Sequence, residues 1–355
     1  MDKTIENKFS FLSSVESEVW HSNKDPKAYE WWYFDALSDN GKEALVIVFL
    51  DNFIFSPRYN RADIGATSTE RYPAVSFTYF ENGQPKYRCL NEFSEDQFSA
   101  EEGSPGCRIA GNSFTFQKAE YGSGYFISVN LELSGGRKLE AHFEWLSIEA
   151  GLRAGDDVTP DHGHRWNMVA PRSDVTGRIT VTGRRGGVTN VHHFRGTGYH
   201  DHKVDDRWLA KTVHDWHWGR VHYADSTAVF HRYRELGESK PETRLIVVKN
   251  GELRERSVEY EEQNYIRDKF GIRYPTRLRL ISEDNIRLRV KPIKIIHSSF
   301  YFLRFLSEFT LTLRDGTPRR TTGISEFVAP KALKYRWLNW LSDVKTYKSR
   351  KSGSE

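Results

Sequence analysis

Two-residue turn signals recur along this chain of 355 residues, between runs that have the pattern of β-strands. Asn-Gly, Asp-Gly and Gly-Gly pairs favour a tight β-hairpin turn, because glycine and asparagine adopt positive φ at little cost. The six pairs are Asn40-Gly41, Asn82-Gly83, Gly135-Gly136, Gly186-Gly187, Asn250-Gly251 and Asp315-Gly316. A hairpin joins antiparallel neighbours, so the sequence predicts mainly antiparallel sheet.

The runs beside these turns alternate apolar and polar residues, as a strand with one buried face requires. Every second residue of Leu139–Trp145 is apolar, and Tyr125–Leu133 repeats the pattern. Similar runs follow at Arg178–Thr182, Thr227–Tyr233, Arg244–Val248, Arg277–Ile281, Ile286–Val290 and Phe309–Leu313. We therefore expect an all-β protein with two β-barrels or sandwiches, a design in which small closed barrels hold apolar ligands.

One amphipathic helix is predicted near the C-terminus, after Pro330. Apolar residues fall there at helical spacing among basic ones, at Leu333, Trp337, Trp340, Leu341 and Val344. A basic face beside Trp and Leu is typical of a helix at a membrane surface. The same stripe also suits a helix docked on a barrel, so both interpretations stay open.

Charge and composition exclude several classes of protein. The net charge is +4, and residues 331–355 alone hold seven Lys/Arg against two Asp/Glu, so the body of the chain offers no broad basic surface for nucleic acid. The longest apolar run, Ala44–Leu50, is too short to span a membrane, and the N-terminus lacks the pattern of a signal peptide. Cys89 and Cys107 are too few for a disulfide framework. We expect a cytoplasmic protein, peripheral to the inner membrane surface if the basic helix contacts lipid.

Histidines are concentrated in one part of the sequence. Ten of the 13 are His162, His164, His192, His193, His200, His202, His214, His217, His222 and His231. Histidine is both the side chain best suited to proton transfer near neutral pH and the commonest metal ligand. The cluster therefore indicates where chemistry is concentrated.

The segment Gly198–His202 places two of these histidines together. On a strand, His200 and His202 point to one face while Tyr199 and Asp201 point to the other. The pair could bind zinc or iron with a third ligand, either His217 or a carboxylate. The other interpretation is a buried hydrogen-bonded junction that only fixes geometry.

Two aromatic segments accompany the histidines. In His214–Arg220, alternation places Trp216 and Trp218 on one face, where their rings could stabilise a passing cation. The segment Glu30–Asp35 holds four consecutive aromatic residues, including Trp32, between two acids. Either segment could also be simple core.

In combination, these motifs make the chain resemble the carotenoid 1,2-hydratase (hydroxyneurosporene synthase) family and the related AttH-like proteins. The resemblance rests on Glu30–Ala36, Trp166–Arg172, Gly196–His202 and Trp216–Arg220. It implies two consecutive lipocalin-like domains, with a hydrophobic ligand between them. Combined with the patterns above, it predicts an N-terminal domain over residues 25–205, a C-terminal domain over 206–330, and a basic helix and tail over 331–355.

The resemblance also implies an activity. Family members act on hydrophobic, often isoprenoid or polyketide molecules. Some add water to a terminal alkene, and related proteins promote cyclisation, including Diels-Alder reactions; none of this chemistry is known to need a cofactor. We therefore expect a hydrophobic small-molecule substrate and no cofactor. Alternatives are a carrier for a lipid or pigment, a polyketide cyclase, and a metal-dependent enzyme that uses His200 and His202.

In one possible mechanism, a neutral carboxyl group protonates a double bond and leaves a tertiary cation. A dry pocket raises the pKa of a carboxyl group, so such a group can stay neutral near pH 7. The first candidate acid is Asp201 and the second is Asp225. His200, His202 and His217 could orient the acid, hold water or remove a proton. The expected substrate-contact residues are Tyr199, Trp216, Trp218, Trp32 and Phe230.

Overall fold

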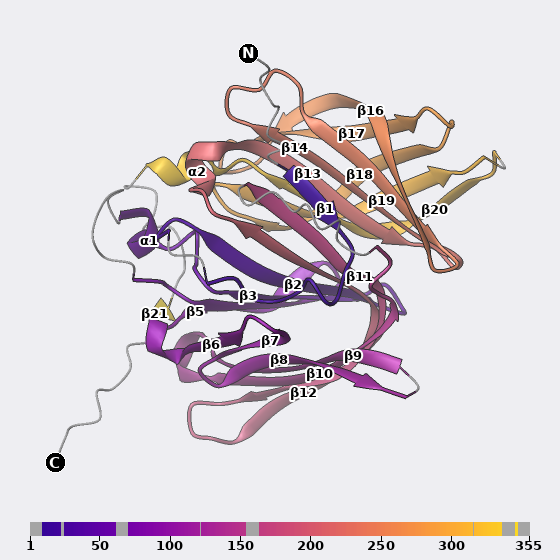
Figure 1. Cartoon of the computed structure of the whole chain (residues 1–355). Helices are drawn as coiled ribbons and strands as arrows, with labels where there is room; N and C mark the ends of the chain where they lie inside the picture. Colours follow the sequence, from indigo (N-terminus) through magenta and orange to yellow (C-terminus); the bar gives the residue numbers. More distant parts are fainter. Residues whose placement is uncertain are drawn as a thin grey trace. The chain divides into compact units, whose positions relative to one another are not determined.

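The computed structural model describes residues 9–22, 25–61, 70–120, 122–153, 163–314, 316–335 and 345–346. The chain divides into two compact units. The first contains most residues up to Trp208, and the second begins at Leu209 and also takes in the turn Asn82–Pro85. Each unit is built from its own sheet (Figure 1).

The first unit is a 13-stranded sheet. Its strands are β1 (Phe9–Leu12), β2 (Tyr29–Ser38), β3 (Glu43–Leu50), β4 (Ala74–Glu81), β5 (Gln84–Glu92), β6 (Phe98–Glu101), β7 (Ser104–Ile109), β8 (Asn112–Ala119), β9 (Gly122–Glu132), β10 (Lys138–Glu149), β11 (His164–Thr182), β12 (Val188–Asp205) and β21 (Lys345–Thr346). Their order is β21-β5-β4-β3-β2-β12-β11-β10-β9-β8-β7-β6, and β1 pairs in parallel with β11. Short helical turns are α1 (Pro57–Arg61), η1 (Glu95–Gln97) and η2 (Ser134–Gly136).

The second unit is a closed barrel of eight antiparallel strands. They are β13 (Val213–His222), β14 (Ser226–Glu235), β15 (Glu242–Lys249), β16 (Glu252–Arg267), β17 (Arg273–Ser282), β18 (Arg287–Ser298), β19 (Phe302–Thr312) and β20 (Pro318–Val328). Pairing of β13 with β20 closes the ring, for example at His217 opposite Phe327. The helical turns α2 (Leu209–Thr212) and η3 (Pro330–Lys334) flank the barrel in sequence.

Each sheet buries one set of alternate side chains. In β10, Leu139, Ala141, Phe143 and Trp145 are buried while the residues between them are exposed, and they join the core of the first unit. The barrel has a separate core that includes Phe230 and Phe309. The period-2 pattern in the sequence therefore corresponds to one buried and one exposed face.

The all-β, antiparallel fold expected from the sequence is confirmed. Five turn dipeptides fall between consecutive paired strands, namely β2–β3, β4–β5, β9–β10, β11–β12 and β15–β16. The sixth, Asp315-Gly316, stands between β19 and β20 in the sequence, but Asp315 lies outside the described residues. Asn250 and Gly251 both have positive φ, at 54° and 75°, as the tight turn requires. Of the two units, only the second closes completely among the described strands.

The expected C-terminal helix falls mostly outside the described residues, which omit 336–344. Its described start is the 3-10 turn η3, and Lys345–Thr346 pair with β5 as a short strand. No helix among the described residues is long and apolar enough to span a membrane.

Candidate functional site

Strand β12 carries the central site residues of the first unit between β2 and β11. It aligns Asp201 with Tyr33 and His202 with Trp32 of β2. Alternation places His200 and His202 on one face of the sheet and Tyr199 and Asp201 on the other, as the strand pattern predicts. All four of these β12 side chains are buried.

Asp201 is held by two donors on the same oxygen. The Tyr199 hydroxyl donates to its Oδ2 at 2.9 Å, and the Trp166 indole Nε1 donates to the same atom at 3.0 Å. Its Oδ1 has no hydrogen-bond partner among the described residues. Burial and the neighbouring Asp201 raise the pKa of Tyr199 well above its ordinary value, so Tyr199 remains a hydroxyl donor. Lys203 places its ammonium 3.9 Å from Oδ2.

His200, on the opposite face, contacts an acceptor at each ring nitrogen. Nδ1 lies 3.0 Å from the Tyr33 carbonyl oxygen, and Nε2 lies 2.5 Å from a carboxylate oxygen of Glu18. A carbonyl oxygen can only accept, and Glu18 also accepts a hydrogen bond from the Tyr125 hydroxyl. Both ring nitrogens of His200 therefore face acceptors, which is the arrangement of an imidazolium beside a carboxylate. The ring stacks on Phe34 with a centroid distance of 3.8 Å.

His202 contacts a different carboxylate. Its Nε2 lies 2.6 Å from Glu30 Oε1, and Nδ1 of His21 lies 3.1 Å from the same oxygen. Burial alone would raise the pKa of Glu30, but His202 and His21 outweigh it and lower this pKa below its ordinary value. The His202 ring stacks on Trp32 with a centroid distance of 5.1 Å.

The remaining expected residues belong to the second unit. His217 lies inside the barrel, where Nδ1 is 3.2 Å from the Tyr260 hydroxyl and the ring contacts Phe230. Burial lowers the pKa of His217 to about 4, against the opposing charge of Glu262. Trp216 and Trp218 alternate with His217 along β13 and are also buried.

Asp225 has a different environment from Asp201. It is an exposed turn residue that accepts from Arg319 at 2.7 Å and pairs with Lys249 at 3.0 Å. Hydrogen bonds from Lys249 and Arg319 lower the pKa of Asp225 to about 2. A carboxyl group in this state is ionised at neutral pH and is a poor proton donor.

Sequence reasoning missed three residues that contact the site histidines and gave no role to a fourth site residue. Glu18 and His21 come from the segment before β2, and no local motif marks them. Glu30 belongs to the aromatic segment Glu30–Asp35, but the sequence pattern does not predict its contact with His202. Trp166 belongs to the motif Trp166–Arg172, and its contact with Asp201 depends on the pairing of β11 with β12.

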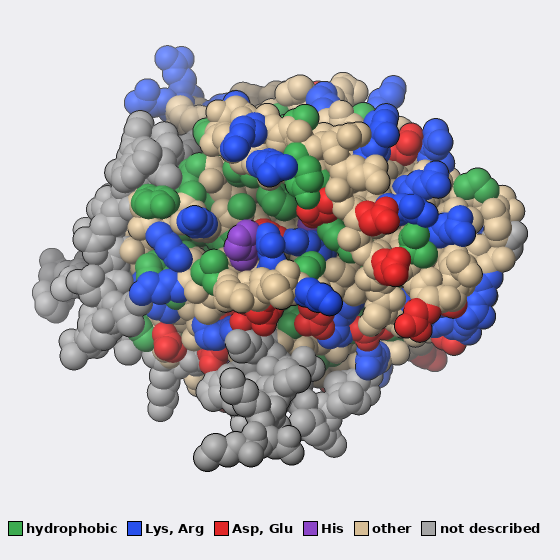
Figure 2. Space-filling model, turned by 90° about the horizontal axis from the view of Figure 1, so that it is seen from above, with side chains coloured by type: hydrophobic (Ala, Val, Ile, Leu, Met, Phe, Trp, Pro, Cys, Tyr) green, Lys and Arg blue, Asp and Glu red, His purple; other side chains and the backbone are tan. Residues whose placement is uncertain are grey.

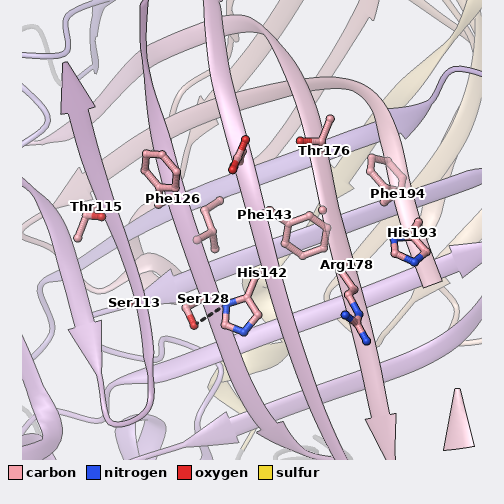
Figure 3. A pocket seen from close by; sticks show the side chains of 13 residues that line it. Ser113, Thr115, Phe126, Ser128, His142, Phe143, Thr176, Arg178, His193 and Phe194 are labelled. Carbon is pink, nitrogen blue, oxygen red and sulfur yellow. Dashed lines mark hydrogen bonds between the residues drawn. The ribbon is translucent and has the colours of Figure 1, made fainter. Parts of the chain in front are cut away.

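The surface of the first unit has a groove of about 560 Å³ across β8 to β12 (Figure 3). His142 lies beside Ser128 there, with their side chains 3.3 Å apart, and Arg178 and His193 continue the row on the next strands. The lining is rich in polar side chains and contains none of the residues expected to form the site. A pocket for a hydrophobic ligand is predominantly apolar, so this groove is a poor candidate.

A second groove, of about 590 Å³, lies on the barrel unit. Its lining includes Arg232, Arg234, Tyr265 and Phe270, and Asp215 pairs with both arginines. Hydrophobic side chains also lie beside Lys and Arg side chains on the face of the molecule that Figure 2 shows. The groove contains no residue assigned to the site from sequence.

Comparisons with known proteins place the chain in a family. The model of the carotenoid hydratase CrtC matches residues 149–345. The hydroxyneurosporene dehydrogenase of Chlorobaculum tepidum is 24% identical over 357 residues, which cover 95% of this chain and 92% of that protein. The acyclic carotenoid 1,2-hydratase of Rubrivivax gelatinosus is 25% identical over 225 residues, which cover 59% of this chain and 49% of that protein.

Solved structures share the fold at low sequence identity. An AttH protein of Nitrosomonas europaea has a TM-score of 0.57 and 14% identity, covering 90% of this chain and 99% of that one. CghA in complex with Sch210972 has a TM-score of 0.52 and 12% identity, covering 89% and 96%. The region matched by the family model includes β12 with Asp201, and it spans more than half of the residues. The chain therefore belongs to the carotenoid hydratase CrtC family.

Proposed function

We propose that this protein is a cofactor-independent hydratase that protonates a double bond of a hydrophobic, isoprenoid-type substrate, with Asp201 as the acid. The observation that carries the proposal is the asymmetry of this buried carboxyl group. Tyr199 and Trp166 both donate to Oδ2, whereas Oδ1 has no partner among the described residues. Oδ1 is therefore the atom that can carry a proton to substrate.

The proposed reaction regenerates the acid. The proton on Oδ1 moves to one alkene carbon, the π electrons form the new C–H bond, and the other carbon becomes a tertiary cation. Water then bonds to the cation and returns a proton to the Asp201 carboxylate. Lys203 stabilises the carboxylate between these steps, while an aromatic ring facing the cation contributes about 0.5–2 kcal/mol.

The histidines have a supporting role in this proposal. His200 and His202 project from the face of β12 opposite Asp201, so we assign them to positioning the strand, through Glu18 and Glu30. His217 lies within the barrel and is given no proton-transfer role. Trp216 and Trp218 remain the proposed substrate contacts of the second unit.

The test is mass spectrometry of candidate isoprenoid and polyketide precursors incubated with the wild type and Asp201→Asn. Asparagine keeps an acceptor for Tyr199 and Trp166 but cannot supply the proton. The wild type should add one water, and the variant should be slower by about a hundred- to ten-thousand-fold. Asp39→Asn, at an exposed carboxyl group of the same unit, should leave the rate unchanged.

Other outcomes distinguish the alternatives. A product of unchanged mass and altered retention, lost in Asp201→Asn, would identify a cyclase. A compound that co-purifies without conversion would support a carrier. Full turnover by the Asp201→Asn protein would refute the assigned acid.

A further inference from the structure

We propose that His21, Glu30 and His202 form a zinc site that joins the N-terminal segment to the sheet of the first unit. The three ligand atoms are His21 Nδ1, Glu30 Oε1 and His202 Nε2, and all lie within 4.8 Å of one another. They come from three places in the chain: the segment before β2, β2 itself and β12. It is the only such group of three or more metal-ligating residues found in the described part of the chain.

The ligand types select the metal. Two imidazole nitrogens and one carboxylate oxygen are a known zinc ligand set, whereas calcium and magnesium prefer oxygen ligands throughout. Zinc–ligand bonds near 2.1 Å in a tetrahedron would place neighbouring ligand atoms about 3.4 Å apart. The present contacts to Glu30 Oε1 are 3.1 Å from His21 and 2.6 Å from His202, and the two ring nitrogens lie within 4.8 Å of each other, so zinc binding requires the His202 ring to move away from Glu30 Oε1.

The surrounding groups hold the ligands in place. The His21 backbone N–H donates to Glu30 Oε2 at 3.0 Å, so the second carboxylate oxygen is fixed. Trp32 stacks on the His202 ring with an interplanar angle of 1°. A metal site needs such supporting contacts to orient its ligands.

The local charge also favours a cation. The Glu30 backbone N–H donates to Asp51 at 2.7 Å, which brings a second buried carboxylate close to the first. Arg71 pairs with Asp51 at 2.6 Å, and this guanidinium is the counter-charge for that carboxylate. Glu30 has His21 and His202 as its own partners, and a divalent ion bound to all three would replace the protons through which the two rings contact this carboxylate.

The exposure of the ligands and a comparison with a neighbouring histidine also support the site. The His21 side chain is 31% exposed, whereas those of Glu30 and His202 are almost fully buried, so an ion can enter from the His21 side and keep water in a fourth position. Glu18 and His200 form a similar carboxylate–histidine pair that lacks a third ligand. Glu18 contacts one histidine and the Tyr125 hydroxyl, so it brings no second ring nitrogen to the pair. The site lies on the face of β12 opposite Asp201, and its metal takes no part in the proposed proton transfer.

The experiment uses the full chain, stripped with a chelator and then titrated with Zn²⁺ in the presence of a competing chromophoric chelator. The wild type should bind one zinc per chain, and a hundred-fold excess over the dissociation constant should raise the melting temperature by about 5 °C. His21→Ala, at the partly exposed ligand, should weaken binding at least a hundred-fold. His142→Ala, at an exposed histidine of the same unit, should bind as the wild type does.

Substitution of Co²⁺ gives a readout that does not depend on the variants. A tetrahedral d–d spectrum in the wild type supports the site even if His21→Ala fails to fold. Equal zinc affinity in the wild type and His21→Ala, or a Co²⁺ spectrum of the hydrated ion, would overturn the proposal. Asp201→Asn should keep zinc binding, so failure of the proposed hydratase function and failure of this site are distinguishable.

Discussion

At the scale of single residues, the buried pair of His200 and Glu18 links β12 to the N-terminal segment. His200 and Glu18 are fully buried, so neither charge can be satisfied by water if its partner is removed. Removal of one member of a buried pair typically costs about 3–5 kcal/mol, because the other charge remains uncompensated. The pair therefore constrains where the N-terminal segment lies on the sheet.

We expect Glu18→Gln to lower the free energy of unfolding by about 3 kcal/mol. Glutamine has nearly the same shape but no charge to balance His200. Urea unfolding followed by circular dichroism measures the change. Glu16→Gln, an exposed carboxyl group two residues away, is the control and should alter stability by less than about 0.5 kcal/mol. Equal midpoints for the two variants would show that the pair is not charged.

His217 should make stability depend on pH. Its pKa in the folded barrel is about 4, below the ordinary 6.5, because burial penalises the charged ring. The unfolded chain therefore binds a proton between pH 6.5 and pH 4 that the folded chain does not, and stability falls as the pH drops through this window. The contribution lost between pH 7 and pH 5 is about 2 kcal/mol.

The measurement compares urea unfolding of the wild type and His217→Gln at pH 7 and pH 5. Glutamine removes the titration but keeps a polar atom near Tyr260. The wild type should lose about 2 kcal/mol more than the variant on acidification. Parallel losses in the two proteins would contradict the depressed pKa of His217.

At the scale of elements, the turn of the β11–β12 hairpin depends on a glycine with positive φ. Gly186 has φ of +86°, whereas Gly187 has no such conformation, and a Cβ on either residue would meet open space. Alanine at Gly186 should therefore destabilise the protein by about 1 kcal/mol through backbone strain alone. Gly187→Ala is the matched control, and it should be neutral or slightly stabilising. Thermal unfolding of both variants checks this, and equal shifts would contradict the role of φ.

Much of the fold was predictable because hairpins are local. The positions of the five described turns and the alternation in Leu139–Trp145 follow from residues close in sequence. Whether a sheet closes depends on pairing between distant segments, such as β13 with β20, and no local pattern encodes it.

The site was predictable only in part, for the same reason. The alternation of His200 and Asp201 on β12 follows from strand geometry alone. Glu18 and His21 reach these strands from a segment with irregular structure, and their contacts exist only after the chain has folded. The exposed ion pairs of Asp225 likewise depend on Lys249 and Arg319, which are distant in sequence.

At the scale of the whole molecule, the two units solve the problem of sheet edges differently. The first unit has end strands, β6 and the two-residue β21, among its described residues. The barrel pairs each of its eight strands with two neighbours and has no free edge. Its core, which includes Val221, Leu280 and Phe309, comes from the same continuous stretch of chain.

A fragment of residues 209–335 should therefore fold by itself. The fragment contains all eight barrel strands. It lacks the turn Asn82–Pro85, whose described contacts with the barrel include the hydrogen bond from Lys294 to the Asn82 carbonyl oxygen. We expect a β-rich circular dichroism spectrum, dispersed amide resonances and one cooperative urea transition. Phe309→Ala in the fragment should cost about 3–5 kcal/mol, because it removes a fully buried ring from the core. A fragment with collapsed amide dispersion and no cooperative transition would show that the barrel depends on the rest of the chain.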